Sequence, residues 1–164
     1  MVTLVPILTL AAAFVFAIVA CWISRPVTAR KVVDRLIRGL MLFPIGLEAL
    51  WAALGHIAFA EQSAAAIGWA PSPFQFEVGV ANLGIGVAGV IGALVASRGY
   101  QWGVTVVTAG FLGGAGVGHL VQISETGNMA AGNAGPILYT DFATPGLTAA
   151  LLLVACFLTD RRAA

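Results

Sequence analysis

Long apolar stretches alternate with short polar stretches along this chain, and their lengths predict helices that cross a membrane. A helix needs about 20 mostly apolar residues to span the hydrocarbon core of a bilayer. Stretches of about that length occur at about residues 2–23, 39–60, 73–97, 102–123 and 139–159. We therefore expect an all-α fold: a polytopic transmembrane helix bundle of five spans that forms one domain over residues 1–164.

The composition supports an integral membrane protein and excludes a soluble domain. Of 164 residues, 60% are hydrophobic and 9% are charged, whereas soluble domains carry about 25% charged residues. The formal net charge is only +1, so we expect the bilayer to be the main partner and no nucleic acid to bind. We expect the protein in the plasma membrane as a multi-pass protein.

The basic residues predict the orientation. In the five-span arrangement every Lys and Arg falls on one side, in the segments after the first, third and fifth spans: Arg25, Arg30, Lys31, Arg35, Arg38, Arg98, Arg161 and Arg162. Cytoplasmic loops of membrane proteins are enriched in Lys and Arg. The N-terminus is therefore predicted outside and the C-terminus inside, and the first span is expected to be retained because this charge follows it rather than preceding it.

The stretch from Ile67 to Gly92 predicts the start of the third helix. Ser72, Pro73 and Gln75 fit a capping box with proline at the first helical position, so a helix is predicted to begin at Pro73. Before it, residues 61–72 are too apolar for a solvated loop. They predict an interfacial or re-entrant segment closed by Gly68, with Trp69 at headgroup level.

Small residues predict how the third and fourth spans pack. Residues 84, 88, 92 and 96 of the third span are Gly or Ala, and residues 110, 114 and 118 of the fourth are all Gly. Such spacing allows two helix backbones to approach closely. We therefore expect these spans to form a tight antiparallel hairpin, with spans two to four as the core and the first span peripheral.

The second span is the first to carry polar residues at depth. Glu48 falls near its middle and His56 about one turn from its outer end, while Pro44 is expected to disturb the helix one turn before Glu48. The preceding segment, residues 24–38, alternates charged and apolar residues. Two alternatives are open for it: a short amphipathic helix on the inner surface, or an extension of the second span.

Six polar side chains are predicted to lie toward the outer side of the bundle, and we take them as candidate ligand-binding residues. They are Glu48, His56, Glu77, Asn82, His119 and Asp141. Ionisable groups are costly inside a membrane, so they normally face the bundle interior or a cavity. The alternative is a structural role. Such groups can hold helices together through hydrogen bonds, and Asp141 could cap the last helix.

Two kinds of site suit this set. His56, His119, Glu77 and Asp141 could complete a four-ligand sphere for a divalent metal, and a haem between the two imidazoles is a less favoured possibility. A proton or small-solute pathway is the other, with Glu48 deepest. The few polar residues in the inner halves of the spans argue against a channel.

Several motifs resemble one family. The runs GHIAFA (55–60), IGWAPSPFQFEVGVANLGIG (67–86) and GNAGPILYTD (132–141), with the Gly118–His119 pair, are similar to small integral membrane proteins of the family DUF6790. The resemblance covers roughly residues 48–146. It supports the five-span arrangement and implies no activity, because the family is of unknown function.

The sequence thus favours a membrane binding module for a cation, proton or small polar ligand reached from the outer face. The alternative is an accessory or scaffolding subunit that packs against another membrane protein or against a second copy of this chain in a homo-oligomer. In that case the polar cluster has a purely structural role. An enzyme is disfavoured, since Ser72 is explained as a cap and no GxSxG elbow occurs.

Overall fold

The computed structural model describes residues 4–160, and side chains up to residue 158. Its elements, in chain order, are α1 (Val5–Ile23), α2 (Ala29–Leu40), the π-helical segment η2 (Met41–Leu47), α3 (Glu48–Ala58), α4 (Ala60–Ile67), α5 (Phe74–Leu94), α6 (Arg98–Thr126) and α7 (Pro136–Asp160). Every regular element in this described range is helical.

The prediction of five spans is confirmed at the level of length and composition. Within the described residues, five helices are long and apolar enough to cross a membrane: Val5–Ile23, Ala29–Ala58, Phe74–Leu94, Arg98–Thr126 and Pro136–Leu158. The side of the membrane on which the termini lie stays a prediction. Arg161 and Arg162, which contributed to it, lie outside the described residues.

The second span is a long helix with an irregular middle. Residues 29–58 run through α2, η2 and α3 without a break, so the segment after α1 extends the second span rather than forming a separate surface helix. Within η2, Pro44 has no N–H to donate, and the N–H of Glu48 donates to the Phe43 carbonyl rather than to that of Pro44. The predicted disturbance at Pro44 is therefore a π-helical turn.

The predicted glycine hairpin between the third and fourth spans is wrong. A Cβ built at Gly84, Gly110, Gly114 or Gly118 would meet no atom of a neighbouring helix within 4 Å in the described part of the chain. The close approach is made by other glycines of α5. A Cβ at Gly89 would lie 2.8 Å from the Gly46 nitrogen, and one at Gly86 would lie 2.8 Å from the Leu50 nitrogen. The α5 glycines that allow this close approach, Gly89 and Gly86, thus face η2 and α3 rather than α6.

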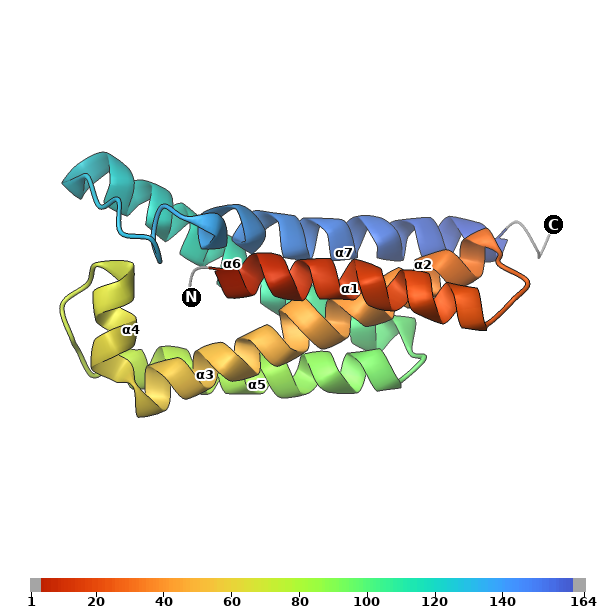
Figure 1. The fold of residues 1–164 in the computed structure, drawn as a ribbon, viewed down its shortest axis with the longest axis horizontal. Helices are drawn as coiled ribbons and strands as arrows, with labels where there is room; N and C mark the ends of the chain where they lie inside the picture. Colours follow the sequence, from red (N-terminus) through yellow and green to blue (C-terminus); the bar gives the residue numbers. More distant parts are fainter. Residues whose placement is uncertain (1–3, 161–164) are drawn as a thin grey trace.

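The helices form two groups that diverge along the bundle. Figure 1 shows α3 and α5 together on one side, α1 and α7 together on the other, and α4 standing across the space between the groups at one end. We call this the α4 end. The opposite end, which holds the turns 24–28 and 95–97, we call the basic end.

Side chains tie the basic end together. Arg98 at the start of α6 forms an ion pair with Asp34 of α2, and Arg38 donates to the carbonyl of Ala93 on α5 at 3.0 Å. Gln101 donates to the Gly92 carbonyl at 2.9 Å. The described basic residues at positions 25–38 and 98 therefore lie at one end, as the orientation argument requires.

The hydrophobic core lies nearer to the basic end and draws on more helices than expected. Ile37, Leu40, Met41 and Ile45 of the second span are fully or almost fully buried, and so is Leu152 of α7. The fifth span thus belongs to the core with spans two to four.

The first span is also less peripheral than predicted. It packs closely on α2, because a Cβ at Gly39 would lie 2.5 Å from the Ala13 carbonyl oxygen. Its opposite face carries the strongly exposed apolar side chains of Ile18, Trp22 and Ile23, as a helix face in contact with lipid would.

Candidate functional site

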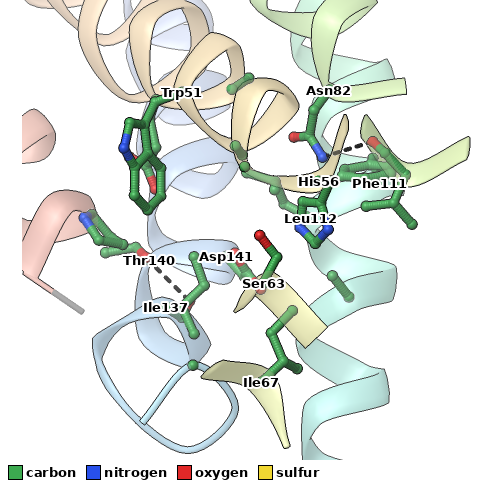
Figure 2. Close-up of a pocket in the computed structure, with 18 of the residues that line it drawn as sticks. Trp51, His56, Ser63, Ile67, Asn82, Phe111, Leu112, Ile137, Thr140 and Asp141 are labelled. Atoms are coloured by element: carbon green, nitrogen blue, oxygen red, sulfur yellow. Dashed lines mark hydrogen bonds between the residues drawn. The ribbon is translucent and has the colours of Figure 1, made fainter. Parts of the chain in front are cut away.

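A cavity of about 470 Å³ lies between the two helix groups on the side of the α4 end. Its walls come from α3, α4, α5, α6 and α7, and Figure 2 shows side chains of all five around it, including Ser63 of α4, Leu112 of α6 and Asp141 of α7. Small-molecule sites usually measure about 300–1,000 Å³. The volume therefore suits one small organic molecule.

Five of the six predicted site residues line this cavity: Glu48, His56, Asn82, His119 and Asp141. They come from α3, α5, α6 and α7, so residues up to 93 positions apart in the sequence share one space. Most of the remaining wall is apolar and includes Ile45, Ile85, Phe111, Leu112 and Ile137.

Glu77 is the exception, and it removes one ligand from the predicted metal sphere. It lies one turn into α5 on an exposed face and is absent from the cavity wall. Among the described residues, no three His, Cys, Asp or Glu side chains are grouped so that they could hold a metal ion. The arrangement of His56, His119, Glu77 and Asp141 around one metal is thus not formed.

His119 is held by a buried amide. Its Nδ1 lies 2.8 Å from Oδ1 of Asn133, while Nδ2 of Asn133 donates to the carbonyls of Asn128 at 2.9 Å and of His119 at 3.4 Å. Because the Asn133 nitrogen is used on two carbonyls, its oxygen faces the imidazole, and an amide oxygen only accepts. Nδ1 of His119 therefore carries the hydrogen.

The other nitrogen of His119 faces a carboxyl group. Nε2 lies 3.6 Å from Oδ2 of Asp141, and both residues are buried, with exposures of 6% and 2%. Asp141 lies inside α7, which begins at Pro136. The prediction that Asp141 caps the last helix is therefore wrong, because the helix starts a turn earlier and leaves this side chain free to face the cavity.

His56 is oriented in a similar way. Its Nδ1 lies 2.5 Å from Oε1 of Gln75, which is 2% exposed. The capping box predicted for Ser72 and Gln75 is wrong, since α5 begins at Phe74 with no side-chain cap hydrogen bond. The Gln75 side chain bonds His56 instead of the helix start.

Glu48 and Asn82 form the deeper polar part of the cavity. Oγ1 of Thr9 on α1 lies 2.5 Å from Oε2 of Glu48 and 3.1 Å from the Pro6 carbonyl. Nδ2 of Asn82 donates to the Val78 carbonyl at 2.9 Å (Figure 2). That bond uses one of the two amide hydrogens, so the amide oxygen and the second N–H of Asn82 remain for the cavity.

Three buried polar atoms on the cavity walls have no hydrogen-bond partner among the described residues: Nε1 of Trp69, Oγ1 of Thr108 and Oδ2 of Asp141. An unpaired buried polar group costs about 1–3 kcal/mol. Such groups are few in native proteins, and each calls for an explanation. All three atoms belong to residues that line the same cavity.

One of the comparisons with known proteins identifies a family. The model of a family of unknown function, DUF6790, matches residues 3–161. This chain belongs to the DUF6790 family. No curated protein and no solved structure matches it. Membership supports the resemblance noted in the sequence and assigns no activity.

The cavity of this DUF6790 protein is covered at the α4 end by α4 itself. Nδ2 of Asn128 donates to the Ile67 carbonyl at 2.9 Å, and the N–H of Gly132 donates to the Ala66 carbonyl at 3.0 Å. These bonds fasten the end of α4 to the loop between α6 and α7. Gly68 stops α4 there, with a φ of 81° that favours glycine, as the sequence predicted.

Sequence reasoning missed several residues of the site. Gln75 was interpreted as a cap but bonds His56, and the contact of Trp69 with His119, at 6.4 Å between ring centroids, was not foreseen. The depth of Trp69 in a membrane stays a prediction. Thr9 and Thr108 lie in apolar runs, where one hydroxyl carries no signal. Asn133 lies among glycines in a loop, and only its contact with His119 reveals its role.

Proposed function

We propose that this DUF6790 protein is a binding protein of the plasma membrane that holds one small organic ligand in the cavity, reached from the outer face. The three unpartnered buried polar atoms on the cavity walls carry the proposal, because a ligand with complementary groups removes their cost. A mostly apolar wall with a few convergent polar groups is the usual composition of small-molecule sites.

Binding is favoured over conduction by the packing at the basic end. Ile45 lines the cavity, and beyond it Leu40, Met41 and Leu152 are fully buried. These side chains fill the interior between the cavity and the ties of Arg38 and Arg98. A ligand bound in the cavity therefore meets a packed apolar layer on that side.

The ligand can be sought directly in purified protein. Wild-type protein is isolated in mild detergent and extracted with organic solvent, and the extract is compared by mass spectrometry with that of Ala115→Phe. Ala115 lines the cavity, so the added ring occupies part of it. Ala109→Phe is the matched control, because Ala109 lies on the same helix with its side chain exposed.

We expect a compound near one equivalent per chain in the wild type and in Ala109→Phe, and its loss in Ala115→Phe. Ala52→Phe on α3 gives an independent filling of the same space. Extracts that are identical in the wild type and in both cavity-filling variants would refute the proposal.

A second candidate function is an accessory subunit, favoured by one observation. Gly110 and Gly114 of α6 are exposed and meet no other described helix within 4 Å, so this face is available to a helix of another membrane protein. Since Gly114 makes no internal contact of this kind, Gly114→Leu should leave the fold intact. Loss of a stoichiometric co-purifying protein in that variant, with unchanged thermal unfolding, would favour this function.

A further inference from the structure

We infer that the ligand of the cavity is an organic ammonium compound, an apolar body with one positively charged nitrogen that donates hydrogen bonds to Asp141. The inference rests on the proposed function and names the class of ligand. It depends on the charges that line the cavity, on the hydrogen-bonding state of His119 and on the apolar wall.

The cavity wall carries two carboxyl groups and, among the described residues, no Lys or Arg. The titratable residues lining the cavity are Glu48, His56, His119 and Asp141. The described basic residues lie toward the basic end, where Arg38 and Arg98 bond the backbone and Asp34. Two carboxyl groups with no Lys or Arg beside them favour a cationic ligand, because a buried ionised group is costly unless it is paired.

Asp141 and His119 present two acceptors to the same point. Since Nδ1 of His119 donates to Asn133, the neutral imidazole has its lone pair on Nε2. That lone pair faces Oδ2 of Asp141 at 3.6 Å, and this oxygen accepts no hydrogen bond from the described residues. An ammonium group carries several N–H donors and can therefore serve the carboxylate and the imidazole together.

The remaining wall suits an apolar body next to that nitrogen. Trp69 lies beside His119, with ring centroids 6.4 Å apart, and an aromatic face attracts a cation within about 6 Å. Phe111, Leu112 and Ile137 continue the wall from α6 and α7 (Figure 2). Inorganic cations lack an apolar body and would leave this surface uncovered, so the organic class fits better.

Two probes of nearly equal shape separate charge from size: 4-phenylbutylamine, which is protonated at pH 7, and 4-phenylbutan-1-ol. Their binding is measured by titration calorimetry on protein in lipid nanodiscs, with empty nanodiscs as the blank. We expect the amine to bind wild-type protein at least tenfold more tightly than the alcohol. Ala115→Phe should weaken both.

The carboxylate is tested by Asp141→Asn, which keeps the shape and removes the charge. We expect amine affinity to fall at least tenfold while alcohol affinity stays unchanged, and retained alcohol binding shows that the variant is folded. Glu77→Gln is the matched control, since it removes an exposed carboxylate outside the cavity. If Asp141→Asn does not fold, Glu48→Gln replaces it, with the same direction expected.

Equal affinity of the wild type for amine and alcohol, with both lost in Ala115→Phe, would overturn the inference and leave small-molecule binding standing. Binding of neither probe would also overturn it. The proposed function itself fails only if the extracts of wild-type and cavity-filled protein are the same.

Discussion

Asn133 decides which nitrogen of His119 faces the cavity. It is fully buried, accepts from Nδ1 and gives its own hydrogens to two backbone carbonyls. Asn133→Ala leaves the imidazole N–H and both carbonyls without this partner, so we expect a loss of about 1–3 kcal/mol in the free energy of unfolding. Unfolding by a denaturing detergent, followed by circular dichroism, measures it.

The control for this prediction is Gln62→Ala. Gln62 also lines the cavity but is exposed, and truncating an exposed polar side chain usually changes stability by less than about 0.5 kcal/mol. Equal stability of Asn133→Ala and Gln62→Ala would mean that the amide does not hold the histidine.

At the residue scale, the sequence predicted the residues that line the cavity better than the residues that hold them through hydrogen bonds. Ionisable residues in apolar stretches are conspicuous, so Glu48, His56, His119 and Asp141 could be selected without a structure. Their partners could not, because Gln75 and Asn133 lie 19 and 14 positions away from the histidines they bond. Glu77 was included wrongly because the face of a helix that turns inward is set by packing that the sequence did not reveal.

At the scale of the elements, α5 contains glycines that close helix packing requires and glycines that it does not require. A Cβ at Gly89 would lie 2.8 Å from backbone of η2, whereas one at Gly84 would meet no neighbouring described helix. Replacing an interior helical glycine by alanine stabilises a free helix by about 1 kcal/mol. We therefore expect Gly84→Ala to raise thermal stability slightly, and Gly89→Ala to lower it by about 1–3 kcal/mol through overpacking.

Thermal unfolding of the two variants in the same detergent tests this pair, and each serves as the control for the other. A loss of stability in Gly84→Ala with none in Gly89→Ala would restore the hairpin predicted from sequence. That prediction failed because α5 carries glycines on more than one face, such as Gly84 and Gly89. The spacing of glycines in the sequence does not show which of these faces another helix covers.

The α4 segment is fastened by few bonds, so a single change should loosen it. Asn128→Ala removes the bond to the Ile67 carbonyl and leaves that of Gly132, and within the loop it also removes the bond that Oδ1 of Asn128 accepts from the Ala130 N–H. One hydrogen bond contributes about 0.5–1.5 kcal/mol, which corresponds to a roughly two- to tenfold increase in the open population of α4.

Cysteine labelling measures this opening. Ser63 lines the cavity from α4 and is half-buried, so Ser63→Cys in a background with Cys21 and Cys156 replaced by alanine reports the opening through its rate of reaction with a maleimide. Asn128→Ala should raise that rate by the same factor, while Glu125→Ala, an exposed change nearby, should not. An unchanged rate would mean that α4 does not depend on this bond.

For the whole molecule, the positions of the basic residues predict the orientation in the membrane. Ser124 and Ser97 are exposed at the α4 end and the basic end respectively. In the same cysteine-free background, we expect Ser124→Cys to react with an impermeant maleimide added to intact cells, and Ser97→Cys only after permeabilisation. The opposite pattern would place the cavity on the cytoplasmic side and contradict the positive-inside argument.

The architecture of the bundle was predictable because hydrocarbon thickness sets helix length, and the apolar runs of this chain match that length. Which helices touch was not predictable, since apolar faces are interchangeable in a membrane and no periodicity separated lipid-facing from protein-facing positions. The cavity is a property of that arrangement. It exists because the group of α3 and α5 and the group of α1 and α7 diverge toward the α4 end, and no single stretch of sequence carries that information.

The π-helical turn at Met41–Leu47 determines which way the whole of α3 faces. Successive residues of an α-helix are about 100° apart around its axis, and a π-helical turn accommodates a residue more than an α-helical turn does. If the same residues formed a regular α-helix while α2 stayed in place, Glu48 and His56 would be rotated together by about 100°, away from Asp141 and His119. Homologous chains that are one residue shorter at this turn should therefore form a regular α-helix there and keep the same cavity lining, so a single-codon deletion in η2 should leave the residues of the site in place.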